Sequence, residues 1–172
     1  MMKTLNSVFT LILSSVSVLG LSQMSYSATA DQTPPQMQVM PAGSIPSQTA
    51  PSQYFSGQAP RLDMSVGVRE APSRLSMASV SFEPSARSNW HTHPAGQMLI
   101  VTAGQGYVQS EGGEKITINP SDMVWTPAGV KHWHGATEKN AMTHLAIQES
   151  VDGKNVNWQE PVTDMQYAQS KD

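Results

Sequence analysis

Histidines and one glutamine in the second half of the chain have the spacing of a metal site. His91 and His93 are one residue apart on a segment that we expect to be extended, and alternate residues of a strand share a face. Neutral imidazole is the commonest metal ligand in proteins, so this pair can bind one ion from one side. Gln97 follows after a turn and can add a carbonyl oxygen, and His132 begins a second histidine group. Together these residues predict a divalent ion held by nitrogen and oxygen.

Three further polar residues are candidates for catalysis. In a regular strand His134 would share a face with His132, while His144, Ala146 and Gln148 would alternate on one face of the last strand. A divalent ion lowers the pKa of a nearby imidazole, which would then be a neutral base near pH 7. We therefore predict that His144 transfers a proton, and that His134 and Gln148 orient the substrate.

The same residues have simpler interpretations. His91 and His93 could be surface histidines of a strand, and His134 could lie outside the site. His144 could be a buried histidine that is satisfied by its hydrogen bonds. Tryptophans in the same region are more typical of core or rim packing than of substrate binding; they are Trp90, Trp125 and Trp133.

Composition excludes several classes of function. The chain has 172 residues, which is typical of a single domain, and its net charge is −3. No run of Lys or Arg offers a footprint for phosphates, so we expect no nucleic-acid partner. The chain contains no cysteine, which excludes disulfides, thiolate metal sites and cysteine nucleophiles.

The first thirty residues have the pattern of a secretory signal peptide. A basic start at Lys3 is followed by the apolar stretch Val8 to Leu21 and by Ala28-Thr29-Ala30, a small-residue cleavage pattern. A membrane anchor is the alternative, but the apolar stretch is shorter than the roughly 20 residues that span a bilayer. We predict cleavage after Ala30, giving a secreted protein, periplasmic in a Gram-negative cell, with no membrane association.

Beyond the signal peptide we expect a linker over residues 31–51 and one folded domain over residues 52–172. The linker is rich in Pro, Gln and Ser and has no apolar period, which favours an extended segment. The domain contains about nine short apolar or alternating stretches separated by Gly and Pro turns, a pattern of all-β sandwiches and barrels. The expected strands are Leu62–Glu70, Ser76–Glu83, Ser88–His93, Gln97–Ala103, Tyr107–Ser110, Lys115–Ile118, Asp122–Thr126, Lys131–Gly135 and Ala141–Glu149, followed by a short helix at Asp164–Ser170.

Two histidine-bearing segments of the domain resemble the motifs of the cupin superfamily. The first is similar to the pattern G-x5-H-x-H-x3,4-E-x6-G and runs from Ser85 to Gly104. The second is similar to G-x5-P-x-G-x2-H-x3-N and runs from Ser121 to Ala136. Serine replaces the first glycine of both motifs and alanine replaces the asparagine, changes that affect turns. Gln97 replaces the usual glutamate and is the informative departure.

The stretch from Ala78 to Gln148 is more closely similar to small manganese cupins that act as bacterial (R)-selective hydroxynitrile lyases. That resemblance implies a single-domain cupin barrel, or jelly roll, with manganese bound by His91, His93, Gln97 and His132, and assembly as a homodimer or homotetramer. Such a ligand set carries no charge, so the ion keeps its full charge and can act as a Lewis acid. Iron, nickel, cobalt and zinc accept the same donor atoms.

The function expected from this resemblance is cleavage and synthesis of cyanohydrins, small-molecule substrates, by a metal-dependent carbon–carbon lyase. A cupin dioxygenase or isomerase with the same ligands is the enzymatic alternative. A cupin that binds a small carboxylate or sugar acid without catalysis belongs to a different class. The additional histidines favour catalysis, because a binding protein needs no group to transfer protons.

Overall fold

The computed structural model describes residues 36–67 and 71–169. The predicted signal peptide and the first residues of the predicted linker lie outside this part of the chain. Contacts within the chain separate the residues up to Gln38 from a compact unit that begins at Val39. The description below concerns this second unit.

Three eight-residue strands form the centre of a six-stranded antiparallel sheet. They are β4 (Leu75–Phe82), β12 (Met142–Glu149) and β7 (Gln97–Gly104), and buried residues alternate along both β7 and β12. This alternation arises because one face of each strand packs on the core, as the sequence pattern predicts. The strand order is β1-β3-β4-β12-β7-β10, completed by β1 (Gln48–Thr49), β3 (Arg61–Val66) and β10 (Met123–Thr126).

The second sheet is built from shorter strands around β11 (His132–Ala136), all of whose residues are buried. Its order is β13-β6-β11-β5-β2, and β8 pairs with both β11 and β9. The other strands are β2 (Phe55–Ser56), β5 (Arg87–Ser88), β6 (His91–Thr92), β8 (Gly106–Ser110), β9 (Ile116–Ile118) and β13 (Asn157–Trp158).

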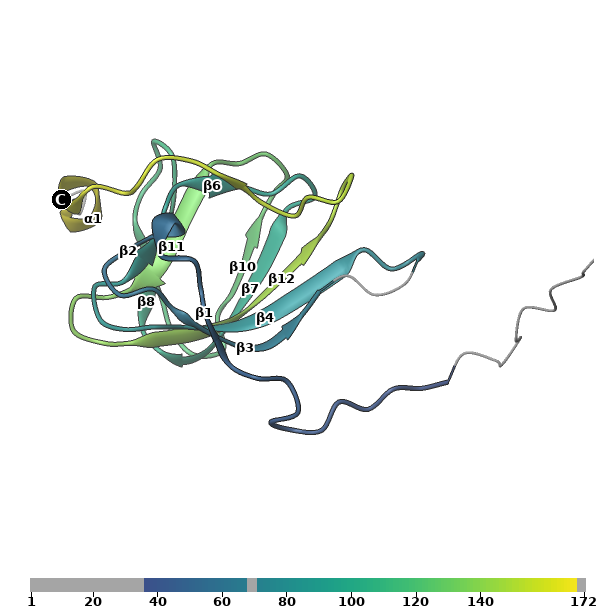
Figure 1. Cartoon of the computed structure of the whole chain (residues 1–172). Helices are drawn as coiled ribbons and strands as arrows, with labels where there is room; N and C mark the ends of the chain where they lie inside the picture. The colour runs from purple at the N-terminus through teal and green to yellow at the C-terminus, as the bar shows by residue number, and fades with distance from the viewer. Residues whose placement is uncertain (1–35, 68–70, 170–172) are drawn as a thin grey trace, which may run out of the picture. The chain divides into compact units, whose positions relative to one another are not determined.

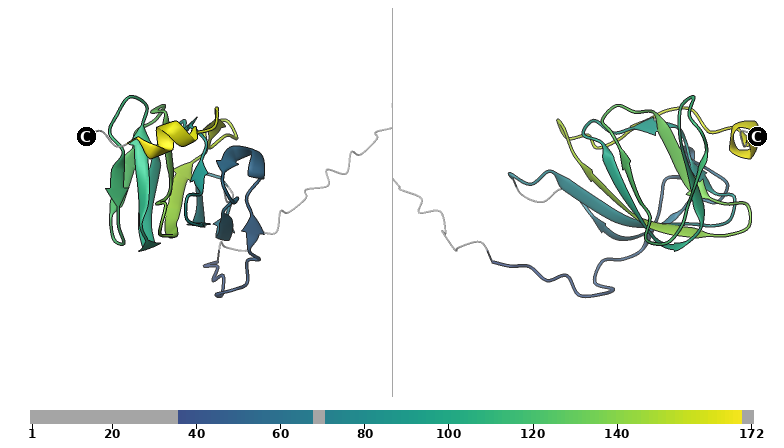
Figure 2. Two further views of the ribbon diagram at one scale, coloured as in Figure 1. Left: turned by 90° about the vertical axis from the view of Figure 1, so that its left-hand side faces the viewer. Right: turned by 180° about the vertical axis from the view of Figure 1, so that it is seen from behind.

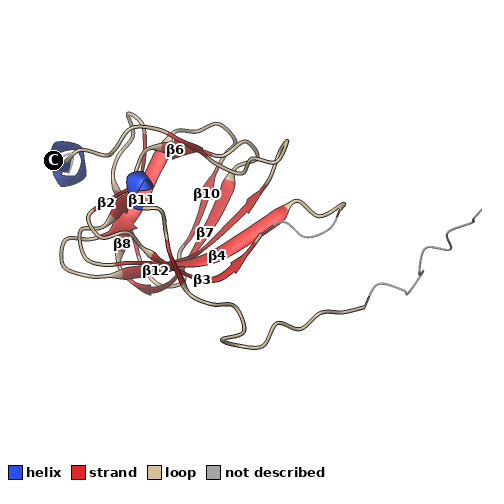
Figure 3. Ribbon diagram, in the orientation of Figure 1, coloured by secondary structure: helices blue, strands red, loops and turns tan. Residues whose placement is uncertain are grey.

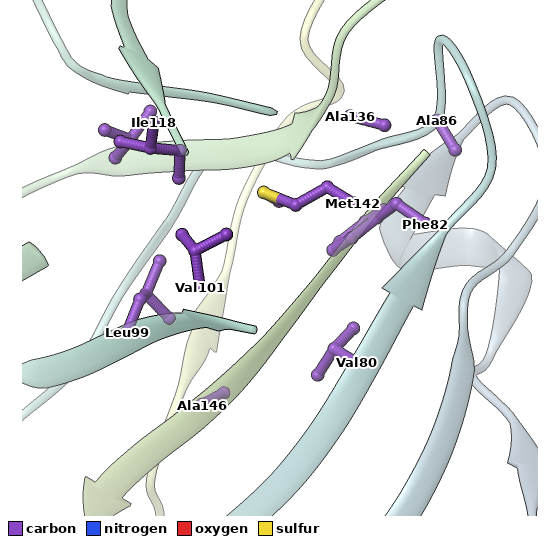
Figure 4. Close-up of a cluster of buried hydrophobic side chains, with 10 residues drawn as sticks. Val80, Phe82, Ala86, Leu99, Val101, Ile118, Ala136, Met142 and Ala146 are labelled. Carbon is purple, nitrogen blue, oxygen red and sulfur yellow. The ribbon is translucent and has the colours of Figure 1, made fainter. Parts of the chain in front are cut away.

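The two sheets face each other and enclose the hydrophobic core (Figures 1 and 2). Figure 3 shows how little of the described chain is helical. Core side chains come from both sheets, so the core holds the two layers together (Figure 4). The core consists of Val80, Phe82, Ala86, Leu99, Val101, Val108, Ile118, Ala136, Met142 and Ala146. The prediction of an all-β sandwich or barrel is confirmed.

The predicted strand Ser88–His93 is wrong in one respect, because it is broken into β5 and β6. Between them the backbone bonds to loops: Asn89 N–H donates to Tyr54 O (2.8 Å) and Trp90 N–H donates to Glu160 O (3.0 Å). The Asn89 side chain also donates to Gln53 O at 3.1 Å. Loop partners replace a neighbouring strand here, and alternation in the sequence does not distinguish the two.

Three short strands were not predicted. β2 pairs with β5, with Phe55 opposite Ser88. β1 pairs with β3 through Gln48 and Leu62, so the sheet begins within the predicted linker of residues 31–51. β13 pairs with β6, with Trp158 opposite His91. The predicted strand Leu62–Glu70 ends at Val66, after a break in register that follows Asp63, and residues 68–70 lie outside the described chain.

The C-terminal segment is fastened to the second sheet by buried hydrogen bonds. The Arg87 guanidinium donates to Val162 O (3.0 Å) and forms an ion pair with Asp164 (2.6 Å). The Tyr167 hydroxyl donates to Ala136 O, at the end of β11, over 2.8 Å. These contacts hold the predicted helix, which is observed as α1 (Asp164–Ala168). Among the described residues, no helix is long and apolar enough to cross a membrane.

Candidate metal centre and cavity

Three predicted ligands converge in the interior. His91 opens β6, His93 follows it directly, and His132 opens β11 and pairs with His91 across the two strands. One ring nitrogen from each histidine lies within 4.8 Å of one from each of the others. All three side chains are buried, so the site lies inside the fold.

Backbone carbonyls fix the orientation of each ring. Nδ1 of His91 donates to Asn89 O (2.9 Å), Nδ1 of His93 to Asn155 O (2.5 Å) and Nδ1 of His132 to Val130 O (3.0 Å). A proton on Nδ1 leaves the lone pair on Nε2 free, as in metal-binding histidines whose second nitrogen is anchored. Nε2 of His93 is buried and has no hydrogen-bond partner, so a cation would satisfy this atom.

Gln97 completes the donor set. Its Oε1 lies 3.2 Å from Nε2 of His132, and its amide nitrogen donates to Oε1 of Gln148 over 3.4 Å. The turn before it requires Gly96, which has a φ of +83° and whose Cβ, if present, would lie 2.8 Å from Thr126 O. The structure thus brings together all four residues that the sequence predicts as ligands.

Burial keeps the ligand histidines neutral. Desolvation lowers the pKa of His91 well below its ordinary value, and its histidine neighbours lower it further. Desolvation likewise lowers the pKa of His93 to about 4 and lowers that of His132. At pH 7 the site therefore offers three imidazole lone pairs and an amide oxygen with no formal charge.

A cavity of about 300 Å³ opens beside these ligands. One wall is aromatic: Trp158 stacks on Tyr54 with ring centroids 4.7 Å apart and lies 4.9 Å from the ring of His91. Among the described residues that line the cavity, none is Asp, Glu, Lys or Arg. The remaining lining residues are Ala50, Pro51, Phe55, Leu62, Ser65, Val66, Gly67, Ser76, Met77, Ala78, Val80, His93, Gln97, His134, Ala146, Gln148, Asn155 and Val156.

The structure places the predicted catalytic residues at two depths. His134 and Gln148 line the cavity, whereas His144 is fully buried and is not part of its lining. Nε2 of His144 lies 3.2 Å from Nδ1 of His134, so one ring donates a hydrogen bond to the other. Both rings contact Phe82, at centroid distances of 5.8 and 5.9 Å. His144 therefore faces a molecule in the cavity only through His134.

The pKa values of this pair are also lowered. Desolvation lowers that of His134 well below its ordinary value, with smaller contributions from neighbouring histidines. Desolvation lowers the pKa of His144 to about 4. Both rings are therefore neutral at pH 7, and the pair can accept a proton.

Sequence reasoning missed several residues of the site, including Tyr54 and Phe55 of the aromatic wall. Ser76 continues the alternation of Ala78 and Val80 on β4, a signal that could have placed it in the cavity. Trp158 lies on a strand of only two residues, for which the sequence gives no pattern. Asn155 lies in a loop and contributes mainly its backbone oxygen. Every residue has such an oxygen, so the residue type gives no sign of this contact.

Comparison with known proteins agrees with this geometry. The family model described as "Cupin domain" matches residues 78–148. A protein named (R)-mandelonitrile lyase from Granulicella tundricola is 52% identical over 131 residues, covering 76% of this chain and 98% of that protein. This chain belongs to the cupin family.

Solved structures support the same fold. A cupin-like protein from Thermotoga maritima is 33% identical, with a TM-score of 0.64 over 69% of this chain and 89% of that one. The polyketide cyclase RemF from Streptomyces resistomycificus shares 12% identity and a TM-score of 0.57 over 77% of this chain and 91% of its own, a likeness of fold alone. The predicted single-domain cupin fold is confirmed, as is the likeness to bacterial hydroxynitrile lyases.

Proposed function

We propose that this cupin is a metal-dependent hydroxynitrile lyase that cleaves cyanohydrins of aromatic aldehydes and catalyses the reverse addition. The observation that carries the proposal is the cavity, whose described lining residues include no Asp, Glu, Lys or Arg. It is aromatic on one side and ends on neutral metal-ligand atoms and on His134. The name of the relative from Granulicella tundricola supports the same reaction class.

The donor atoms fit a divalent metal. His91, His93 and His132 would each offer Nε2 and Gln97 would offer Oε1, as the free Nε2 of His93 suggests. When bound, such an ion supplies Lewis acidity toward the oxygen or the anion of the substrate. We assign manganese from the resemblance to manganese cupins, since iron, nickel, cobalt and zinc accept the same atoms.

His134 is the group that we assign to proton transfer, in place of His144. When His134 donates Nδ1–H to His144 Nε2, its own Nε2 carries a free lone pair. This nitrogen takes the proton of the substrate hydroxyl as the bond between the carbinol carbon and the nitrile carbon breaks. The electron pair of that bond leaves with cyanide, which takes this proton back from His134 to become hydrogen cyanide, while the aldehyde remains. The hydrogen bond to His144 orients the His134 ring, and Gln148 is placed to orient the substrate.

The cavity disfavours the alternative of a carboxylate or sugar-acid binding protein. Such a ligand calls for Lys or Arg, since charge-assisted hydrogen bonds are the strong contacts to carboxylates. Among the described residues, the lining offers neither. An uncharged aromatic molecule with one polar end is a better match for Tyr54, Phe55 and Trp158.

The test is a cleavage assay on purified protein of known metal content. We expect (R)-mandelonitrile to yield benzaldehyde, whose formation is measured by its ultraviolet absorbance. Chelation should abolish this activity and addition of Mn²⁺ should restore it. Acetone cyanohydrin, which is small and aliphatic, should be a poorer substrate. A protein that contains the metal and cleaves neither compound would contradict the proposed lyase activity.

Secretion and oligomerisation are part of the same proposal. We propose that residues 1–30 are removed, so that the mature protein begins at Asp31, and that it is a homodimer or homotetramer. The mass of the protein recovered from the periplasm of a Gram-negative host tests the first point. Light scattering of the purified protein tests the second, and a monomer would contradict it.

A further inference from the structure

Three polar side chains form a row across adjacent strands of the six-stranded sheet. Ser76 on β4 is directly opposite Gln148 on β12, and Gln148 is directly opposite Gln97 on β7. Residues that are paired in this way across antiparallel strands project to the same face, so all three reach the cavity. The row therefore runs from one of the predicted metal ligands to a serine that has had no role so far.

The hydrogen bonds along this row have a defined direction. Ser76 Oγ accepts from the amide nitrogen of Gln148 (3.3 Å) and from that of Asn155 (3.1 Å), and donates to the Gln148 backbone carbonyl (3.2 Å). A hydroxyl has one proton and two lone pairs, so the bonding capacity of Ser76 is complete. The Gln148 amide is thereby oriented with Oε1 toward Gln97, where it accepts from the Gln97 amide nitrogen.

Asn155 connects this row to a second ligand. Its side chain donates to Ser76, while its backbone carbonyl accepts from Nδ1 of His93 over 2.5 Å. One loop residue therefore contacts groups that orient both the amide ligand and an imidazole ligand.

We propose that Ser76 and Asn155 are positioning residues that hold Gln97 with its oxygen, and not its NH2 group, directed at the three histidines. The two ends of an amide are nearly equal in size, so shape alone does not select between them. Only the oxygen has a lone pair for a cation, whereas the NH2 group is a donor. Because Gln148 presents an acceptor to Gln97, the flipped amide would place two oxygens against each other.

The proposal rests on the metal-binding part of the proposed function and not on the reaction. Both positioning residues lie outside residues 78–148, the part of the chain that the cupin family model matches. The orientation of Gln97 therefore depends on residues that flank the matched region on both sides.

The experiment measures Mn²⁺ affinity by electron paramagnetic resonance, which separates bound from free ion. For Ser76→Ala we expect the Kd to rise by roughly 10- to 100-fold, as is typical when the support of a metal ligand is lost. Ser76→Thr keeps the hydroxyl and should recover most of the affinity. Ser81→Ala is the matched control, because Ser81 is also on β4 and shares a hydrogen bond with Thr143 of β12 (3.0 Å), but on the opposite face.

A double-mutant comparison separates positioning from general structural damage. If Ser76 acts through Gln97, then Ser76→Ala should not raise the Kd further in a Gln97→Ala background. Asn155→Ala should raise the Kd in the wild-type background, and part of its effect should persist without Gln97, since the same residue supports His93.

An unchanged Kd for Ser76→Ala, or an equal loss with and without Gln97, would overturn the proposal. So would a wild-type protein that takes up no Mn²⁺. If the variants changed the Kd for Mn²⁺ as expected but the protein cleaved no cyanohydrin, the proposed lyase activity would be wrong and the positioning roles would still stand.

Discussion

The five histidines form two groups that are alike in burial and differ in what holds them. His91, His93 and His132 each donate Nδ1–H to a backbone carbonyl. His134 and His144 bond to each other instead, ring nitrogen to ring nitrogen. In both groups desolvation is the largest cause of a lowered pKa.

That difference determines what each group can do. A backbone carbonyl accepts a hydrogen bond and does not titrate. It therefore fixes the histidine tautomer that carries its proton on Nδ1, and it leaves a permanent lone pair on Nε2. A second imidazole can be donor or acceptor, so the bond between His134 and His144 can reverse. The first arrangement suits a fixed binding site, and the second suits a group that gains and loses a proton.

The strongest test of this contrast exchanges one member of each group for alanine. His93→Ala should lose bound metal and all measurable cleavage, because a ligand is missing. His134→Ala should keep the metal and its stabilising effect, since an ion that binds only the folded state raises the unfolding temperature. Elemental analysis and unfolding with and without chelator measure both. Full metal occupancy in His93→Ala would remove this residue from the ligand set.

Within the pair, turnover should depend on the two histidines unequally. His134→Ala should lower kcat by roughly 10²- to 10⁴-fold, the usual loss for a positioned acid–base group, with little change in KM. His144→Ala should lower kcat less, because His134 still faces the substrate without its partner. Steady-state kinetics with (R)-mandelonitrile at fixed metal occupancy decide the order. A larger loss in His144→Ala would restore the sequence-based assignment of the base.

Acid should destabilise the metal-free protein through both groups. Their folded-state pKa values lie below the ordinary histidine value of 6.5, so the unfolded chain binds more protons once the pH falls below that value. Stability is therefore present above pH 6.5 and is lost as the pH falls, down to about 4, where His93 and His144 also protonate in the folded state. Each histidine contributes on the order of 1 kcal/mol per pH unit in this range.

Denaturant unfolding of chelated protein between pH 7.5 and 4.5 measures this slope. His144→Gln should lower the slope of the unfolding free energy against pH by an amount that corresponds to about one bound proton, since one titrating group is removed. A slope that is the same in this variant would show that His144 does not contribute.

The smallest effect should come from Ala78, an apolar residue of the cavity wall on β4. Ala78→Leu should lower kcat/KM for mandelonitrile relative to acetone cyanohydrin by about tenfold, in the range expected for a few methylenes in an apolar pocket. Metal content should not change. If the ratio of the two kcat/KM values stayed at its wild-type level, the aromatic group would have to bind elsewhere. Phe82→Leu is an unsuitable control here, because Phe82 packs on His134 and His144.

The sequence allowed prediction of the parts of the site that repeat at short spacing. His91 and His93 lie close together in an extended segment and Gln97 follows one turn later, so local geometry brings these three side chains together. His132 joins them through the pairing of β11 with β6, and it was identified because it lies in the second cupin motif. Which of His134 and His144 lines the cavity could not be predicted, because alternation shows the face of a strand to which a side chain points and not its distance from a cavity. Asn155 was missed because its anchor is a backbone oxygen from a loop 62 residues away from His93.

For the fold, the long strands were predictable, whereas the two-residue strands β1, β2 and β13 were not. β4, β7 and β12 alternate over eight residues, which is enough for a period of two to stand out. β1 and β13 have two residues each, and their pairing is decided by the strands beside them.

The attachment of the C-terminal segment bears on when the site can form during synthesis. The chain leaves the ribosome from its N-terminus, and domains fold as their last required contacts become available. The histidines at β6 and on β11 are made by residue 134. However, β6 obtains its second partner, β13, only with Trp158, and the Ala136 carbonyl obtains its hydrogen bond from the Tyr167 hydroxyl only with Tyr167. A nascent chain therefore carries all five histidines before it can hold them in place. Any ion acquired in the final geometry is acquired after Tyr167 has been added to the chain.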